Sequence, residues 1–321
     1  MDTFSILMPL KDRVSYTRRI MNKWNSEGFP YEIIIADGGQ DLYIQEELSD
    51  KSNFENLNYT YIKYPFDMDL NNFYAKMADA VMKIKTSTVC LMDNDDFIDT
   101  DSISKCLEIL KDPTYSSARG LMQDTTGRNM YSEYPDSIIA DTAATRMIEQ
   151  TKHFHGNWHN ITRTNHIQAQ WKMIEVVKPN NFRIVEQITG YMNTIFGNSH
   201  RGDFPWMMHE YSQRIKMQSG DLGAHFPSQE EWISANYWPE EFNKMTELVG
   251  AAISYHDKIP IDEALKIFRE SYHFKLPHLK TVGIDGLSAY SLDAGIKFAK
   301  NLGYDYNRID KMFEIMEQCK V

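Results

Sequence analysis

An acidic tetrapeptide, Asp93-Asn94-Asp95-Asp96, is the densest group of side chains in the sequence that could perform chemistry. Its three carboxylates repel one another unless solvent or a cation offsets their charge. Hard divalent cations such as Mg²⁺ and Mn²⁺ prefer carboxylate ligands. A cation held here could bridge to phosphate oxygens and stabilise a leaving diphosphate. The same residues also favour turns and helix caps, which is the plainer interpretation.

Two other polar segments follow apolar runs in the same manner. Residues 11–13 (KDR) follow the apolar run 4–9, and Asp37-Gly38-Gly39 follows the β-branched run 32–36. Asp37 could accept a hydrogen bond from a base N–H or a ribose hydroxyl, although on its own an ordinary turn is the better explanation. The two glycines would let the backbone turn sharply or approach a ligand closely.

The elements that must position these residues alternate along the first hundred residues. Short apolar runs predict strands at 4–9, 32–36, 59–64 and 88–92. Apolar residues at helical spacing predict helices after the first and third of these, and a further helix is expected to be capped by Thr100 or Asp101. This alternation predicts a doubly wound, mixed but mostly parallel α/β sheet. Ligands bind such sheets beyond the carboxyl ends of the strands, where the polar segments lie.

The remainder of the chain is less regular. Residues 113–230 are rich in His, Asn, Trp and Met, and we expect loops, a few strands and the acceptor side of a site there. Apolar residues recur at helical spacing from about residue 231 onward. We therefore predict one domain over 1–230 and a helical C-terminal region over 231–321.

The overall composition narrows the classes of function. The 321 residues carry 34 Lys+Arg against 45 Asp+Glu, a formal net charge of −11, which argues against a nucleic-acid binder with a broad basic surface. Three sparse cysteines predict reduced thiols and a cytoplasmic protein. No apolar run reaches the roughly 20 residues of a membrane span. Peripheral membrane association and homo-oligomerisation stay open.

Three segments together resemble a family 2 glycosyltransferase of the GT-A fold: SILMPLKDR, EIIIADGG and NNFYAKMADAVMKIKTSTVCLMDNDDF. The resemblance covers roughly residues 3–100. It implies a nucleotide diphosphate sugar donor and a Mn²⁺ or Mg²⁺ cofactor, and so makes 1–230 a nucleotide-sugar-binding and catalytic domain. It assigns the metal to Asp93 and Asp95, with Asp96 as a substitute.

The resemblance also implies the donor contacts. It places nucleobase contact at Asp37 and further donor contacts at the first loop, around Pro9 and Asp12. It places Lys76 facing the nucleotide, and Asn94 of the acidic tetrapeptide joins the donor-binding set. The sequence departs from the family pattern at Asp12, where an Asn is common, and at Gln40, where a Ser is usual. These departures bear on the identity of the donor more than on the fold.

The family inverts the anomeric centre by direct displacement, which needs a base for the acceptor hydroxyl. Glu186 fits the family's position for that base, and Asp203 and Glu210 are rivals. Arg201 could contact the diphosphate, because a guanidinium matches phosphate geometry. His209 could do the same or complete the metal shell, and structural roles are open for both.

The segment 153–159 (HFHGNWH) with His166 is unusual in composition. A zinc site, a sugar-contact surface built on Trp158, and plain packing are the three interpretations. His153, His155 and His159 are its histidines.

These observations favour a metal-dependent, inverting hexosyltransferase of the kind used in polysaccharide biosynthesis. It would move a sugar from a nucleotide diphosphate sugar to a glycan, a lipid-linked acceptor or another hydroxyl. A sugar nucleotidyltransferase is an alternative, but its usual Gly-rich loop is absent from residues 10–13. A non-catalytic nucleotide- or glycan-binding module is the other.

Overall fold

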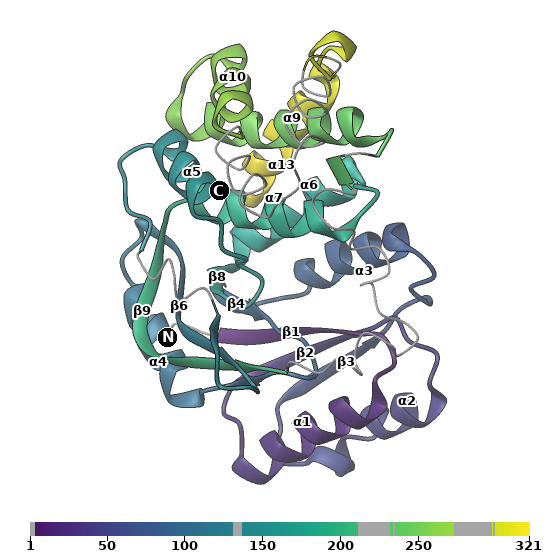
Figure 1. The fold of residues 1–321 in the computed structure, drawn as a ribbon. Helices are drawn as coiled ribbons and strands as arrows, with labels where there is room; N and C mark the ends of the chain where they lie inside the picture. The colour runs from purple at the N-terminus through teal and green to yellow at the C-terminus, as the bar shows by residue number, and fades with distance from the viewer. Residues whose placement is uncertain (1–3, 131–136, 211–231, 234, 273–296, 298) are drawn as a thin grey trace.

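The computed structural model describes residues 4–130, 137–210, 232–233, 235–272, 297 and 299–321 (Figure 1). Its strands are β1 (Phe4–Leu10), β2 (Glu32–Asp37), β3 (Tyr59–Lys63), β4 (Thr88–Leu91), β5 (Phe97–Ile98), β6 (Tyr115–Asp124), β7 (Asn129–Met130), β8 (Ile161–Arg163) and β9 (Asn198–His209). Its α-helices are α1 (Val14–Glu27), α2 (Leu42–Ser49), α3 (Leu70–Met82), α4 (Thr100–Ile109), α5 (Ala143–Lys152), α6 (Thr164–Val177), α7 (Phe182–Ile195), α9 (Trp238–Asp257), α10 (Ile261–Ser271) and α13 (Tyr306–Cys319). A 3₁₀ helix, η1 (Lys51–Phe54), follows α2.

The strands form one mixed sheet in the order β3-β2-β1-β4-β8-β6-β9-β5, with β7 paired to β6. The first four of these are parallel to one another, as the alternation of strands and helices predicts. The antiparallel strand β8 joins β4 to β6, and β6 runs parallel to β9. The predicted strands at 4–9, 32–36, 59–64 and 88–92 are therefore confirmed to within two residues.

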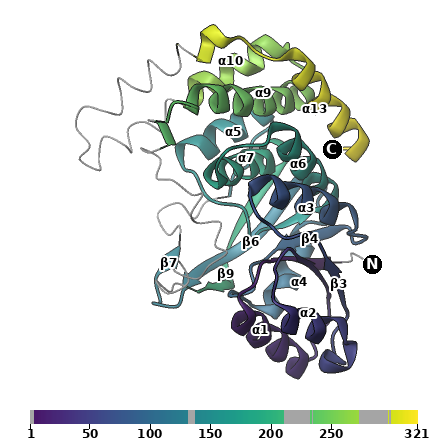
Figure 2. The same cartoon turned by 90° about the vertical axis from the view of Figure 1, so that its right-hand side faces the viewer.

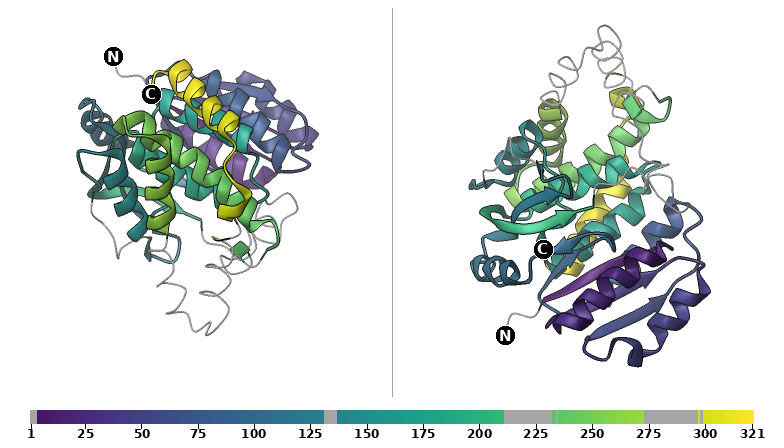
Figure 3. Two further views of the ribbon diagram at one scale, coloured as in Figure 1. Left: turned by 90° about the horizontal axis from the view of Figure 1, so that it is seen from above. Right: turned by 60° about the horizontal axis from the view of Figure 1, so that its bottom comes forward.

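Alternation along the parallel strands divides the apolar side chains between two cores. In β1, Ile6 and Met8 face a core closed by α1, α2 and α4, whereas Leu7 faces the opposite core. Figure 2 shows α1, α2 and α4 on one side of the sheet and α3, α6 and α7 on the other. The right-hand view of Figure 3 shows α1 lying across the strands on the first side.

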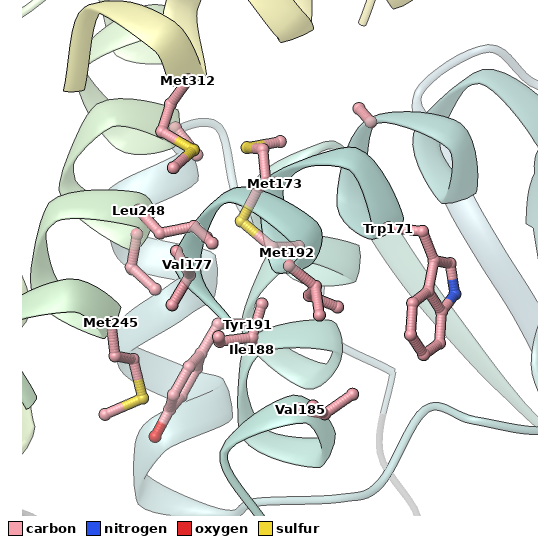
Figure 4. Close-up of a cluster of buried hydrophobic side chains, with 14 of the residues drawn as sticks. Trp171, Met173, Val177, Val185, Ile188, Tyr191, Met192, Met245, Leu248 and Met312 are labelled. Atoms are coloured by element: carbon pink, nitrogen blue, oxygen red, sulfur yellow. The ribbon is translucent and has the colours of Figure 1, made fainter. Parts of the chain in front are cut away.

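The second core continues into the C-terminal helices. Met173 of α6, Tyr191 of α7, Met245 of α9 and Met312 of α13 are buried in one apolar cluster (Figure 4). The prediction of a helical C-terminal region is thus confirmed for α9, α10 and α13. The proposed boundary near residue 230 lies in 211–231, outside the described residues, and stays a prediction.

The middle of the chain is more helical than the sequence indicated. Helices α5, α6 and α7 occupy much of 143–195, where loops were expected. In α7, Gln187, Asn193 and Thr194 are as buried as Ile188 and Tyr191. Its apolar residues nevertheless recur at helical spacing, at Ile184, Ile188, Tyr191 and Ile195, and the expectation of loops overlooked this pattern.

Three smaller predictions meet the structure as follows. The cap of α4 is Asp99, whose side chain accepts the Ser102 N–H, so Thr100 and Asp101 were each placed too late. Cys90, Cys106 and Cys319 are buried free thiols. Within the residues that the structure describes, no helix is long and apolar enough to cross a membrane.

Candidate functional site

The carboxyl ends of the parallel strands meet at one edge of the sheet. Leu10 at the end of β1 is in register with Asp37 of β2, which is in register with Lys63 of β3. The chain leaves β4 beside them, where the Met92 N–H donates to the Leu7 carbonyl at 3.1 Å. The acidic tetrapeptide therefore begins next to β1, which separates it from β2 in the sheet.

The tetrapeptide's three carboxylates lie together. One oxygen of each of Asp93, Asp95 and Asp96 lies within 4.8 Å of the others. Burial, followed by repulsion from neighbouring carboxylates, raises the pKa of Asp93 and of Asp95 to about 6. Closely spaced oxygen donors that resist ionising together form a donor set that fits a hard divalent cation.

Asp96 differs from its two neighbours because histidines face it. His209 Nδ1 lies 2.9 Å from Asp96 Oδ1, and His159 Nε2 lies 3.3 Å from Oδ2. Burial alone would raise the pKa of Asp96, but the contact with His209 and the charge of His159 outweigh it and hold this pKa below its usual value. The Asp96 contact also raises the pKa of His209 to about 9. Asp96, His159 and His209 form a second compact group of donor atoms.

Two arginines from the start of α1 offset the acidic charge. Arg13 Nη1 lies 3.0 Å from Asp95 Oδ2. Arg19 donates to the Asp95 carbonyl at 2.7 Å and to Glu210 Oε2 at 2.9 Å. Asn94 points the other way, donating to Thr17 Oγ1 at 2.8 Å inside α1. In the structure Asn94 therefore anchors α1 to the site, and donor contact by Asn94 stays a prediction.

Asp37 is buried in the turn after β2. Its Oδ1 accepts the Gly39 N–H at 2.7 Å, and its Oδ2 accepts the Tyr61 hydroxyl at 2.6 Å. Lys63 Nζ lies 3.5 Å from the same Oδ2. Both oxygens therefore have protein partners, so the carboxylate shapes this turn, and nucleobase contact through Asp37 stays a prediction.

The two departures from the family pattern meet in space. Asp12 Oδ1 accepts the backbone N–H of Gln40 at 2.8 Å. The turn is tight, because a Cβ on Gly39 would lie 2.7 Å from the Asp12 nitrogen. Asp12 and Arg13 have φ angles of 57° and 56°, a left-handed conformation that costs free energy in residues other than glycine. This first loop, with the half-buried Pro9 in the strand before it, is thus fixed against the second turn.

Lys76 is buried beneath these two turns. Its ammonium pairs with Asp67, which is 1% exposed, and donates to the Leu10 carbonyl at 3.2 Å. The Asp67 N–H donates to the Gly38 carbonyl at 2.9 Å. Lys76 therefore links the end of β1 to the turn after β2. Its predicted contact with the nucleotide is not tested by this arrangement.

The three candidate bases lie in different surroundings. Glu186 lies half-buried on α7, and Asp203 is exposed on β9. Glu210 lies beside the acidic cluster, where its N–H donates to Asp96 Oδ1 at 3.0 Å and its carboxylate pairs with Arg19. The structure brings Glu210 to the cluster, and the role of base stays a prediction for all three.

A buried cationic group that the sequence analysis missed surrounds Arg201. Arg119 of β6 is in register with Arg201 of β9, and Arg119 Nη2 lies 2.9 Å from His155 Nδ1. Arg201 donates to Gln150 Oε1 at 2.8 Å. Burial, with Arg201 and Arg119 nearby, lowers the pKa of His155 to about 2. The sequence did contain one sign of this group. Arg119 is the single charged residue in the run 115–122, which is otherwise uncharged.

The remaining residues of the His-rich segment divide between packing and the site. Trp158 packs edge-to-face on Trp171, with ring centroids 5.9 Å apart, and His166 packs beside Phe196. His159 alone joins the acidic cluster. Packing is thus the role visible for His166, whereas Trp158 also lies beside Asp93 and acts to lower the pKa of that carboxyl. Sugar contact by Trp158 stays a prediction.

A pocket of about 290 Å³ opens where β5, β6 and β9 meet. Its lining includes Phe97, Leu121, Trp206 and Met208, and no basic residue. It begins one residue after Asp96, but its apolar lining does not suit a diphosphate.

No family model matches the sequence, and no curated protein matches it. The structure is similar to those of Staphylococcus aureus TarS. For TarS 1-349 the TM-score is 0.57 at 14% identity, covering 99% of this chain and 91% of that one. For TarS 1-349 in complex with UDP-GlcNAc it is 0.55 at 16% identity, covering 92% and 80%. A longer TarS structure gives 0.58 at 15% identity, but the chain spans only 45% of it.

These similarities confirm the predicted fold class, an α/β fold with a GT-A-like, mostly parallel sheet. At such low identity they concern the fold alone. Membership of family 2 stays a prediction.

Replacing Lys76 with Met should lower the free energy of unfolding by about 3–5 kcal/mol, because Asp67 would remain buried without its partner. Lys83→Met is the matched control, since the Lys83–Asp79 pair is exposed and should contribute only about 0–1 kcal/mol. Urea unfolding followed by tryptophan fluorescence measures both. Equal losses in the two variants would contradict the role given to Lys76.

Replacing Asp93 with Asn should stabilise the metal-free protein at neutral pH. Burial raises the folded-state pKa of Asp93 to about 6, so the folded protein binds the Asp93 proton more tightly than the unfolded chain does. The resulting contribution to the free energy of unfolding is complete below pH 4 and is lost as the pH rises through 6. The variant's advantage over the wild type should therefore grow by roughly 1–3 kcal/mol between pH 4 and pH 7.5. Urea unfolding in a chelating buffer at both pH values tests this, and a pH-independent difference contradicts it.

Proposed function

We propose that this protein is a metal-dependent, inverting glycosyltransferase that uses a nucleotide diphosphate sugar. The observation that supports this most is the carboxylate cluster at the end of β4, beside β1. That edge is where ligands bind open α/β sheets. The fold is shared with TarS, whose 1-349 fragment has been crystallised in complex with UDP-GlcNAc and with UDP.

The donor would lie across the loops that follow β1, β2 and β4. Asp93 and Asp95 would hold Mn²⁺ or Mg²⁺, with His209 completing the shell. Such an ion, when bound, offsets the charge that develops on a departing diphosphate. Asp95 Oδ2 already faces Arg13, so this oxygen would be shared between the arginine and the ion. The acidic residues would thus attract the ion while Arg13 and Arg19 keep the unloaded cluster folded.

The nucleoside would rest on the first two turns. Asp12 and Asp37 fix these turns through backbone N–H groups, and Lys76 holds them from below. With Pro9 and Asn94 they would form the donor cleft. Arg201, supported by the buried Arg119, would supply positive charge from β9 for an anionic part of a substrate.

Glu186 is the proposed base, because it stands in the first turns of α7, which begins at Phe182, and the resemblance places the base near the start of a helix. Glu210 is paired with Arg19, and Asp203 is exposed to solvent on β9. A base must reach the acceptor hydroxyl within hydrogen-bond distance, which α7 would provide on the acceptor side. The acceptor itself is proposed only by class, as a hydroxyl of a glycan or a lipid-linked molecule. A cytoplasmic location, with or without peripheral membrane contact, belongs to the same proposal.

Replacing Asp95 with Ala should abolish metal-dependent release of nucleoside diphosphate. The measurement is nucleoside diphosphate release from a panel of UDP-, GDP- and dTDP-sugars with Mn²⁺ or Mg²⁺, after binding of these donors and of CMP-sugars is ranked by thermal shift. Asp101→Ala is the control, because Asp101 is an exposed carboxylate on α4 and should keep full activity. Full activity in Asp95→Ala contradicts the proposal. Donor binding without any product from the wild type would instead favour a binding module.

Replacing Glu186 with Gln should lower kcat about 10²- to 10⁴-fold with little change in donor binding, because only proton removal is lost. Asp203→Asn and Glu210→Gln should retain more activity than Glu186→Gln. Single-turnover rates and donor affinity are measured for all three variants. If Asp203→Asn or Glu210→Gln suffers the largest loss in kcat, the role of base passes to that residue.

A further inference from the structure

Glu241, a carboxylate of the C-terminal helix α9, is buried against the start of α7. The residue is 1% exposed. Its Oε1 accepts the Asn180 N–H, and its Oε2 accepts hydrogen bonds from Asn181 Nδ2 at 3.1 Å and Trp232 Nε1 at 3.3 Å. A carboxylate offers two acceptor oxygens and no donor, so a neutral amide of the same shape would leave at least one of these N–H groups without an acceptor. Its neighbours therefore require the charge, although burying it is costly.

Asn181 transmits this contact to the helix. It is the N-cap of α7, and its Oδ1 accepts the Ile184 N–H at 3.2 Å. The Asn181 amide therefore has one correct orientation, with its oxygen toward α7 and its nitrogen toward Glu241. Turning the amide round would break both hydrogen bonds. Glu241 thus fixes the orientation of the side chain that begins α7.

The proposed base follows these contacts within one turn of helix. Glu186 lies two residues after Ile184, in the second turn of α7. The next residue, Gln187, accepts the Tyr272 hydroxyl at 3.0 Å, and Tyr272 directly follows α10. The C-terminal helical region therefore contacts α7 both before and after Glu186.

The start of α7 also borders the acidic cluster. Phe182, the first residue of α7, packs edge-to-face on Trp158, with ring centroids 5.6 Å apart. Trp158 lies beside Asp93 and acts to lower the pKa of that carboxyl. One aromatic side chain thus separates the first turn of α7 from the carboxylates. A displacement of this turn would move Glu186 relative to the acidic cluster.

We propose that Glu241 is a positioning residue that holds α7, and with it Glu186, in place beside the acidic cluster. The C-terminal helical region would then set the rate of proton removal through contacts that are remote from the donor. The inference rests on the proposed function, because it takes Glu186 as the base. Displacing a catalytic group by about 1 Å can lower a rate on the order of 10²-fold, so a hydrogen bond one turn away is close enough to control it.

Glu241→Gln tests this proposal, with Glu247→Gln as the matched control. Glu241→Gln keeps the shape of the side chain but turns an NH₂ group toward donors, so kcat should fall about 10- to 100-fold with donor affinity unchanged. Glu247 is an equally buried carboxylate of α9, but it accepts the Asp305 N–H and pairs with Arg308 at the start of α13. Glu247→Gln should therefore lower stability to urea and leave kcat unchanged. Single-turnover rates, donor affinities and urea unfolding are measured for both.

Asn181→Asp should rescue Glu241→Gln. The carboxylate that this second substitution supplies can cap Ile184 with one oxygen and accept the new amide N–H with the other. The bonded path from α9 to α7 is then restored with its polarity reversed, and most of kcat should return. A double variant no more active than Glu241→Gln would overturn the proposal, because a general loss of stability is not repaired in this way.

Asn181→Ser carries the same test if Glu241→Gln does not fold. Serine still caps a helix, but the substitution removes the amide N–H that Glu241 accepts. We expect a lower kcat with unchanged donor affinity. A folded Asn181→Ser variant with the kcat of the wild type would overturn the proposal.

Hydrogen exchange separates this inference from the proposed function, because it needs no turnover. Peptides covering 182–187 should exchange faster in Glu241→Gln than in Glu247→Gln or the wild type. Faster exchange there, in a protein that turns over no donor, refutes only the proposed function. A wild type that transfers sugar, with equal kcat in Glu241→Gln and Glu247→Gln, refutes this inference alone.

Discussion

The structure around the candidate site depends on keeping three carboxylates together at the end of a buried strand. The donor oxygens of Asp93, Asp95 and Asp96 lie within 4.8 Å of one another after β4, and burial, followed by repulsion between these carboxylates, raises the pKa of Asp93 and of Asp95. Opposite charge arrives from two directions. Arg13 at the N-cap of α1 and Arg19 within α1 come from one side, and His209, the last residue of β9, comes from the other.

This need for opposite charge explains several features of the surrounding fold. The loop between β1 and α1 accepts two left-handed residues, and this brings Arg13 over Asp95. The short strand β5 pairs with the end of β9, and that pairing carries His209 to Asp96. Asn94 fixes the start of α1 from inside the cluster. The site and its supports are therefore mutually dependent.

The sequence predicted the parallel half of the sheet well, because each of its strands is a short apolar run that ends at a turn or a cluster of acids. It also predicted that the acids would gather at one edge, since parallel strands share the direction of their carboxyl ends. It failed for α6, whose buried polar residues interrupt the helical period, and the expectation of loops overlooked α7, whose apolar residues do recur at that period. It also could not pair Asp96 with His159, because 63 residues separate them in the chain and only the antiparallel strand β8 brings them together. Arg119 was missed for a similar reason, since His155 lies in the loop after α5 and Arg201, in register with Arg119, lies on β9.

The two residues that join the first two turns by a hydrogen bond differ in how freely they can be substituted. At one end Asp12 contributes a side-chain oxygen, whereas at the other Gln40 contributes only its backbone N–H. Any residue with an amide hydrogen can therefore stand at position 40, and proline alone is barred. Position 12 tolerates far fewer substitutions, because the Asp12 carboxylate holds the turn after β2. Asp12 also directly precedes Arg13, which contacts Asp95. A residue other than the family's usual Ser at position 40 therefore leaves the hydrogen bond between the turns unchanged. The side chain at position 40 can change without breaking that bond.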